Sequence, residues 1–304
     1  MKKGACLHQA PFFYLSVNMA NCLFCSDLHG RTRRYGKLFR VIRDEEPDAV
    51  FLGGDLLPGA VQIFSANFPH NNFVTDYLAG ELTRIREDQG TAYPEIFLIL
   101  GNDDGRCEET AIIDAEERGL WHYVHNRKLS LGSFQIYGYS FVPPSPFRLK
   151  DWEKYDVSRY VDPGCVPPED GIHTVPVSDY EMRYSTISDD LEVLTDGDDL
   201  SRSIMLFHSP PYRTNLDRAA LDGRMIDHAP LDVHVGSIAI QRFIKRKQPL
   251  ITLHGHIHES SRITGSWMDR EGGTFMFSAA HDGPELALIR FDPDDPESAT
   301  RELL

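Results

Sequence analysis

The sequence predicts an α/β protein in which parallel strands are covered by helices. Short unbroken apolar runs recur along the chain, and segments with apolar residues at helical spacing separate them. Repeated strand–helix–strand units form parallel sheets, and ligands gather beyond the carboxyl ends of their strands. With 304 residues and 41% hydrophobic content, the chain can bury a large core. We interpret it as one domain that carries an insertion.

The first half of the chain contains three predicted strands, each followed by a helix. The strands cover 21–26, 49–52 and 96–100. The first helix, 35–45, places Leu38, Val41 and Ile42 on one face and ends before Pro47. Two more helices are expected at 73–89 and 108–118, and two more strands at 122–125 and 133–139.

The second half is less regular. Prolines and acidic residues crowd an insertion at about 141–200, with one short helix near 186–194. It either covers the site or is a packed surface excursion. A strand at 204–207, a helix at 237–247 with Ser237 as N-cap, and strands at 250–253, 274–278 and 286–290 follow. We expect the acidic tail from Asp292 to be frayed. Residues 1–18 are expected to be a loosely held leader before a domain at 19–304.

Charge and cysteine content narrow the classes of function. The formal charge of −15 repels nucleic-acid backbones and anionic membranes. Five irregularly spaced cysteines argue against a disulfide framework, so we expect a cytoplasmic protein. Cys22 and Cys25 lie within an apolar strand pattern, which favours small buried residues over a redox pair. No apolar run approaches the ~18–20 residues of a membrane span.

One histidine pair indicates a metal site. His256 and His258 follow the predicted strand 250–253 directly after Gly255. Residues two apart in an extended segment point to the same side, so the two imidazoles can converge on one cation. Taken alone, such a pair is more often a surface feature. His254 is expected to be a core residue.

Other predicted strands end on side chains of the same chemical kind. These are Asp27 and His29 after the first strand, Asp55 after the second, Asn102 after the third and His208 after the strand 204–207. Because the carboxyl ends of parallel strands meet at one edge of a sheet, we expect these groups to lie close together.

In this order the residues resemble the calcineurin-like metallophosphoesterase superfamily. The matching motifs are Asp27-x-His29, Gly54-Asp55, Gly101-Asn102, His208 and Gly255-His256-x-His258, over about 22–258. The stretch from His208 through His234-Val235-Gly236-Ser237 to Glu259-Ser260 is also similar to a small bacterial-type branch. The resemblance implies a four-layer αββα sandwich, in which two mixed sheets are flanked by helices.

The resemblance also implies a ligand set for two divalent metal ions. One ion would take Asp27, His29 and His258; the other would take Asn102, His208 and His256; Asp55 would bridge them. These nitrogen and oxygen ligands suit Mn, Fe or Zn. Two such ions about 3.5–4 Å apart hold a shared hydroxide that attacks phosphorus in line, with Asn102 and His208 in the catalytic centre.

The sequence departs from the family pattern after Asn102. Many members carry there a histidine that assists the leaving group, whereas this chain has Asp103 followed by Asp104. A carboxylate at this position disfavours a dianionic monoester, so we hypothesise a phosphodiesterase in which Asp103 adjoins the substrate. Alternatively, Asp103 turns away and Asp104 anchors the loop.

Substrate contacts are harder to identify. His234 and Ser237 are candidate substrate-binding residues, Arg106 and Arg213 are candidate phosphate clamps, and the turn His281-Asp282-Gly283 is expected to be structural. The predicted partner is a small phosphoester, and the oligomeric state cannot be read. A nuclease is one alternative, which the acidic charge disfavours. A non-catalytic metal-binding scaffold is the other.

Overall fold

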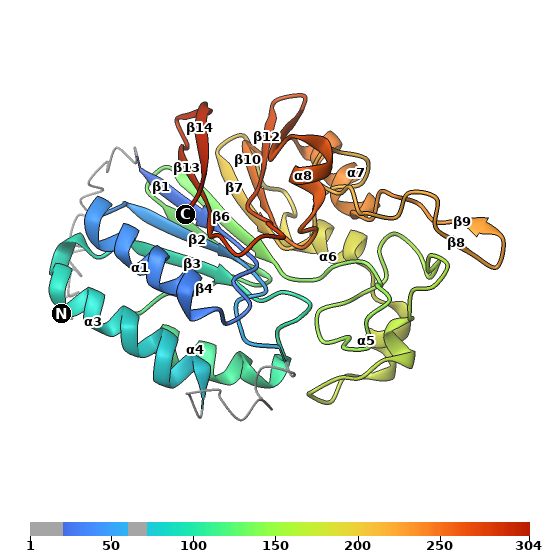
Figure 1. Cartoon of the computed structure of the whole chain (residues 1–304), viewed down its shortest axis with the longest axis horizontal. Helices are drawn as coiled ribbons and strands as arrows, with labels where there is room; N and C mark the ends of the chain where they lie inside the picture. Colours follow the sequence, from blue (N-terminus) through green and yellow to red (C-terminus); the bar gives the residue numbers. More distant parts are fainter. Residues whose placement is uncertain (1–20, 60–71) are drawn as a thin grey trace, which may run out of the picture.

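Two mixed β-sheets pack face to face, with helices on their outer faces (Figure 1). This computed structural model describes residues 21–59 and 72–304, so the proposed leader 1–18 lies outside the described residues. Within the described residues each of these sheets has six strands, which confirms the predicted four-layer arrangement. No helix in the described part of the chain is long and apolar enough to cross a membrane.

The first sheet has the strand order β14-β13-β1-β2-β3-β4. Strands β1 to β4 are parallel to one another, and β13 pairs antiparallel with both β1 and β14. The strands are β1 (Cys22–Cys25), β2 (Ala49–Gly53), β3 (Glu95–Ile99), β4 (His122–Tyr123), β13 (Ala287–Asp292) and β14 (Asp295–Leu303).

The second sheet has the order β11-β12-β10-β7-β6-β5. Its central strands β12, β10, β7 and β6 are parallel, and β11 and β5 form antiparallel edges. The strands are β5 (Arg127–Leu131), β6 (Phe134–Tyr139), β7 (Ser203–Phe207), β10 (Ile251–His254), β11 (Met268–Glu271) and β12 (Thr274–Ser278). A separate hairpin, β8 (Met225–Ile226) and β9 (Ala229–Pro230), projects at the far right of Figure 1.

Helices cover the outer face of each sheet. Those on the first sheet are α1 (Thr32–Glu45), the π-helical turn η1 (Phe73–Leu78), α3 (Ala79–Gln89) and α4 (Glu109–Glu117). Those on the second are α6 (Ile187–Leu194) and α7 (Ile238–Lys247). The short helices are η2 (Gly90–Ala92), η3 (Arg106–Glu108), η4 (Pro168–Asp170), α5 (Asp179–Tyr184) and α8 (Ser260–Thr264).

Alternation along each strand builds two separate cores. In β1, Cys22 and Phe24 face the second sheet, whereas Leu23 and Cys25 face the helices. Strands with both faces buried read as continuous apolar runs, which is why the sequence marks them clearly. The prediction that Cys22 and Cys25 are small buried residues is confirmed, since both are fully buried and burial raises the pKa of both thiols.

The prediction of a frayed acidic tail is wrong. Residues of β14 pair antiparallel with β13, and the main-chain N–H of Leu304 donates to the carbonyl of Leu286 at 2.9 Å. An edge strand is held by main-chain hydrogen bonds while its side chains face solvent, so its polar sequence resembled a tail. The sequence reading also missed β5, β11, α5 and α8, which are short or strongly polar.

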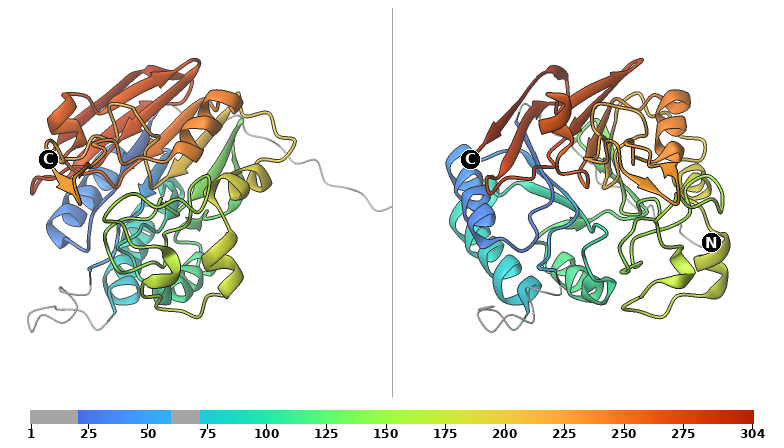
Figure 2. Two further views of the ribbon diagram at one scale, coloured as in Figure 1. Left: turned by 90° about the vertical axis from the view of Figure 1, so that its right-hand side faces the viewer. Right: turned by 45° about the vertical axis from the view of Figure 1, so that its right-hand side comes forward.

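Residues 141–200 contain little regular structure. They include only η4, α5, α6 and isolated bridges, and they lie in the foreground of the left-hand view of Figure 2. The fully buried ion pair between Lys150 and Glu153 holds this segment from within. Asp156 fastens it to α7, because its carboxylate accepts hydrogen bonds from the main-chain N–H groups of Ile238 and Ala239. The expected helix is α6, with Thr186 as its N-cap.

Candidate metal centre

All seven proposed ligands follow the carboxyl ends of strands that lie side by side. Asp27 and His29 follow β1, Asp55 follows β2 and Asn102 follows β3 in the first sheet. In the second sheet, His208 follows β7, and His256 and His258 follow the neighbouring strand β10. Because the two sheets pack face to face, the five strand ends meet at one end of the sandwich.

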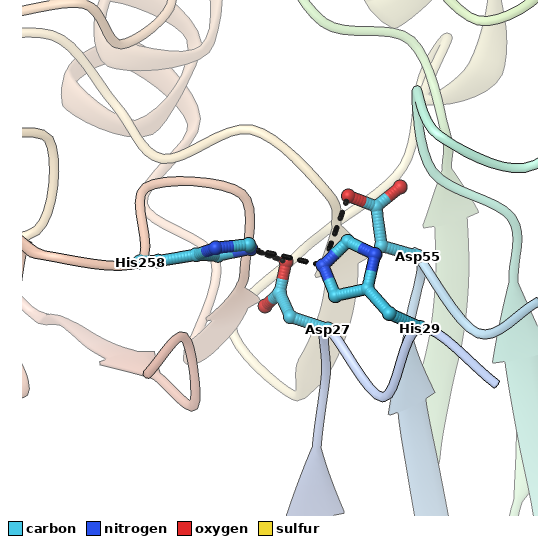
Figure 3. Close-up of side chains that lie close together, drawn as sticks. All are labelled: Asp27, His29, Asp55 and His258. Carbon is cyan, nitrogen blue, oxygen red and sulfur yellow. Dashed lines mark hydrogen bonds and ion pairs between the residues drawn. The ribbon is translucent and has the colours of Figure 1, made fainter. Parts of the chain in front are cut away.

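Four of these side chains form a compact cluster. Ligand atoms of Asp27, His29, Asp55 and His258 all lie within 4.8 Å of one another, and Figure 3 shows the side chains pointing toward a common centre. His258 Nε2 is 3.2 Å from Asp27 Oδ1 and 3.1 Å from His29 Nε2. Such a group of carboxylate oxygens and imidazole nitrogens is of the metal-binding type.

The other three proposed ligands adjoin this cluster. His208 Nε2 is 3.3 Å from Asp55 Oδ2 and 3.1 Å from Asn102 Oδ1. The rings of His208 and His256 have centroids 5.2 Å apart. His208 Nδ1 lies 2.8 Å from the carbonyl oxygen of Gly53, which fixes the ring and directs Nε2 toward Asp55. Asp55 therefore stands between the two groups of side chains.

The backbone at this site adopts left-handed conformations that side chains rarely accept. φ is 57° at Asp27, 48° at His29, 52° at Asp55 and 72° at His256. Each such non-glycine residue costs about 1–3 kcal/mol unless its surroundings hold it, and such residues gather at functional sites. Main-chain hydrogen bonds hold two of them: Asp27 N–H donates to Gly54 O at 2.9 Å, and His29 N–H donates to Asp55 O at 2.7 Å.

Two glycines let the loops approach one another closely. A Cβ atom on Gly101 would lie 2.4 Å from Asp55 Oδ1 and 2.6 Å from His208 Nε2. A Cβ atom on Gly255 would lie 2.8 Å from Asp27 Oδ2. Any larger residue at either position would displace the proposed ligands. Steric crowding therefore explains why these motifs contain glycine.

Mutual charge interactions set the protonation of the cluster. Burial opposes ionisation of Asp27 and Asp55, yet neighbouring histidines lower the pKa of Asp27 well below its usual range and that of Asp55 to about 2. Against the effect of burial, Asp55 raises the pKa of His208 to about 10. Burial and the charge of His208 lower the pKa of His256 to about 3. The two ionised carboxylates and the neutral imidazole of His256 can therefore bind a cation. A cation bound by His208 would displace the proton from its Nε2.

Asp103 and Asp104 have different roles. Asp103 Oδ2 lies 3.5 Å from His29 Nδ1, and its side chain is 46% exposed, so it stays beside the cluster rather than turning away. Asp104 is fully buried and anchors the loop, as the alternative reading proposed. Its carboxylate accepts hydrogen bonds from the main-chain N–H groups of Leu56 (3.1 Å), Leu57 (2.7 Å) and Gly101 (2.9 Å).

The sequence reading missed Arg34, which supports Asp27. Arg34 lies on the apolar face of α1 and is only 3% exposed. Its guanidinium donates to the carbonyl oxygens of Asp27 and Gly283, and thereby ties the turn His281-Asp282-Gly283 to the site. That turn is structural, as predicted. The helix predicted at 35–45 begins one residue too late to include Arg34. The signal in the sequence was its spacing of four residues before Leu38, in line with the apolar face.

Two further histidines have clear positions. His254 is fully buried, with Nδ1 2.9 Å from the carbonyl of Ser209 and Nε2 2.7 Å from Thr252 Oγ1, which confirms it as a core residue. His234 lies outside the cluster, with Nδ1 2.8 Å from Asp217 Oδ1.

Ser237 does not present its hydroxyl to a substrate. It is fully buried; Oγ accepts the main-chain N–H of Ile240 at 3.0 Å as the N-cap of α7, and donates to Asp156 Oδ1 at 2.6 Å. The arginines Arg106 and Arg213 are also engaged locally. Arg106 pairs with Glu109, and the Arg213 guanidinium lies over the ring of Tyr212.

Comparison with known proteins agrees with this geometry. The family described as calcineurin-like phosphoesterase matches residues 20–260, so the chain belongs to the calcineurin-like phosphoesterase family. The family resemblance drawn from the strand-end motifs is thereby confirmed. No curated protein sequence is similar enough to count as a match.

Solved structures with the same fold are remote in sequence. One is TT1561 of Thermus thermophilus, with 17% identity and a TM-score of 0.54 over 94% of this chain and 99% of that one. Another is a dimetal phosphatase from Danio rerio, with 11% identity and a TM-score of 0.50 over 90% of this chain and 92% of that one. At these identities the likeness concerns the fold alone.

Proposed function

We propose that this protein is a dinuclear-metal-dependent phosphoester hydrolase that prefers phosphodiesters. The observation that carries the proposal is the cluster of Asp27, His29, Asp55 and His258, which adjoins His208 through Asp55. Family membership supports a metal-dependent phosphoesterase, and the dimetal phosphatase from Danio rerio supports a pair of cations.

The donor set fits two divalent cations. Asp27, His29 and His258 would hold one, and Asn102, His208 and His256 would hold the other. Asp55 would bridge them. When bound, Mn, Fe or Zn ions in such a site lower the pKa of water and take up charge on phosphoryl oxygens. The chain itself supplies fixed positions: the carbonyl of Gly53 orients His208, and Asp104 ties the loops that carry Asp55 and Asn102.

The preference for diesters comes from Asp103. Its carboxylate adds negative charge 3.5 Å from His29, beside the place where a phosphoryl group would lie. A monoester dianion is repelled by this charge about twice as strongly as a diester monoanion. Asp103→Asn should therefore raise turnover of p-nitrophenyl phosphate relative to bis-p-nitrophenyl phosphate, by roughly fivefold for about 1 kcal/mol of screened repulsion. An unchanged ratio would remove Asp103 as the cause of the preference.

The test of function is hydrolysis by protein reconstituted with Mn²⁺, Fe²⁺ or Zn²⁺ in turn. Wild type should cleave bis-p-nitrophenyl phosphate faster than p-nitrophenyl phosphate, and a clear monoester preference contradicts the diester proposal. His256→Ala and Asn102→Ala should abolish turnover. The exposed His228→Ala serves as the matched control and should retain it. A non-catalytic scaffold would show no turnover with any of these ions.

A further inference from the structure

A pair formed by a buried aspartate and a partly exposed histidine lies in the connection between β7 and α7, outside the seven proposed ligands. His234 Nδ1 is 2.8 Å from Asp217 Oδ1; Asp217 is fully buried, and the His234 side chain is 28% exposed. The same carboxylate accepts hydrogen bonds from the main-chain N–H groups of Arg213, Thr214 and Gly236. Because Asp217 serves only as an acceptor, Nδ1 of His234 carries the shared proton.

One end of this connection is fixed beside His208. The main-chain N–H of Ser237 donates to the carbonyl of Pro210 at 2.9 Å, and Pro210 is the second residue after His208. Tyr212 N–H returns a hydrogen bond to Ser237 O at 3.0 Å. His234, three residues before Ser237, is thereby held near the strand end that carries His208.

The middle of the connection is fixed beside His258. Arg218 pairs with His234 in an antiparallel bridge, and its main-chain N–H donates to Ser260 Oγ at 2.9 Å. Ser260 is the second residue after His258. The aspartate–histidine pair thus lies next to two of the segments that bring ligands to the cluster.

The surroundings of His234 leave its second nitrogen open. Tyr212 meets the imidazole edge-on at 6.2 Å between centroids, and Asp232 accepts the main-chain N–H of His234 at 2.9 Å. The Arg213 guanidinium lies on the ring of Tyr212, and Arg218 is held by Asp222. Among residues 21–59 and 72–304, no group forms a hydrogen bond with Nε2 of His234. Nε2 is therefore the atom that can exchange a proton.

We propose that His234 donates the proton to the leaving oxygen in phosphodiester hydrolysis, with Asp217 as its positioning residue; this inference rests on the proposed function. The reaction benefits from such a donor because negative charge develops on the leaving oxygen as its bond to phosphorus breaks. An imidazole oriented by a buried carboxylate is well suited to general acid catalysis.

Each proton in the proposed hydrolysis step has a source and an acceptor. The oxygen of a water molecule forms a bond to phosphorus as the bond from phosphorus to the leaving oxygen breaks. The proton on Nε2 of His234 passes to that leaving oxygen, which departs as an alcohol or phenol. The proton lost by the attacking water goes to solvent, from which His234 is protonated again before the next turnover.

Leaving-group dependence tests the proposal. A good leaving group such as p-nitrophenolate needs little protonation, whereas phenolate needs more. Using Mn²⁺-loaded protein, we would compare kcat/KM for bis-p-nitrophenyl phosphate and diphenyl phosphate. His234→Gln should lower kcat/KM for diphenyl phosphate about 100-fold, as expected for loss of a general acid. It should lower kcat/KM for bis-p-nitrophenyl phosphate only a few-fold. Asp217→Asn should show the same bias with a smaller loss.

His228→Gln is the matched control, because His228 is an exposed histidine of the same connection. Metal content and thermal unfolding of each variant show whether the cluster and fold are kept. Equal losses of His234→Gln on both diesters overturn this inference and leave the proposed function standing. Wild-type protein that holds metal but cleaves neither diester overturns the proposed function together with the inference.

Discussion

The segments directly after β1, β2, β3 and β10 differ sharply from the long connections at 141–200 and 209–237. These strand-end segments place ligand side chains two to four residues after a buried strand, on left-handed backbone at Asp27, His29, Asp55 and His256. The long connections contain little regular structure and are held by buried carboxylates, Asp156 in one and Asp217 in the other.

This difference shows which part of the molecule must hold its side chains at precise positions. A cation requires several donor atoms at fixed distances, and rigid strand ends supply such positions better than loops do. Substrate recognition and proton transfer depend on groups that vary with the substrate, and long connections carry such groups without disturbing the sheets. Changes in the strand-end segments should therefore remove function or stability, whereas changes in the long connections should have smaller effects or effects that depend on the leaving group.

The largest effect is expected from Asp55→Asn. Asp55 lies between the two groups of proposed ligands, and the substitution removes the negative charge they would share. Changes to residues that only support metal ligands already cost about 10–100-fold, so turnover of bis-p-nitrophenyl phosphate should fall by at least ~100-fold. Elemental analysis should show reduced metal content. Full turnover with full metal content would contradict the bridging role.

A large loss of stability is expected from Asp104→Ala. The substitution leaves three buried N–H donors, on Leu56, Leu57 and Gly101, without their acceptor. One unsatisfied buried group costs about 1–3 kcal/mol, so the free energy of unfolding should fall by about 3 kcal/mol or more. Denaturant unfolding measures it. The half-exposed neighbour Asp103 provides the matched control. Asp103→Ala should lower the free energy of unfolding much less than Asp104→Ala.

A smaller loss is expected from Asp156→Ala in the long segment. Its carboxylate serves the N-terminal N–H groups of Ile238 and Ala239, and loss of such a helix cap costs about 1–2 kcal/mol. Turnover of a metal-loaded enzyme should stay within about twofold of wild type, since Asp156 contacts no proposed ligand. Asp196→Ala, an exposed aspartate in the same segment, controls for charge. A loss of turnover as severe as that of Asp55→Asn would erase the distinction between the two kinds of loop.

The effect that is smallest near neutral pH is a pH dependence that arises where the long segment packs on the sheet. His125 contacts Phe141 and Trp152, and burial lowers its pKa from 6.5 to about 3. Below pH 6.5 this histidine becomes protonated in the unfolded chain but stays neutral in the folded protein. The free energy of unfolding therefore decreases as the pH falls from 6.5 toward 3. The slope is at most about 1.4 kcal/mol per pH unit.

Replacement of His125 checks this assignment. His125→Gln keeps a hydrogen-bond acceptor for the main-chain N–H of Ser140 but does not titrate. Its free energy of unfolding should vary less steeply between pH 6.5 and 4 than that of wild type, measured by denaturant unfolding at each pH. Parallel curves for the two proteins would show that His125 is not the titrating group.

The residues themselves determined the sheets, the family and the seven proposed ligands. Apolar runs marked the buried strands, because both faces of each central strand are covered. Glycine, aspartate, asparagine and histidine at strand ends marked the cluster, because a steric need for glycine and a metal-type donor set leave local traces in the sequence.

Only the tertiary structure decided which polar residues support the site. Arg34 reaches Gly283, and Asp104 reaches the main chain after β2. Both contacts join segments far apart in the chain, and no local pattern records such partners. The same reason explains the errors. Ser237 was predicted to bind substrate, but its position as the N-cap of α7 buries its hydroxyl. The polar edge strand β14 was predicted to be frayed, because main-chain pairing with β13 leaves no signal in side-chain composition.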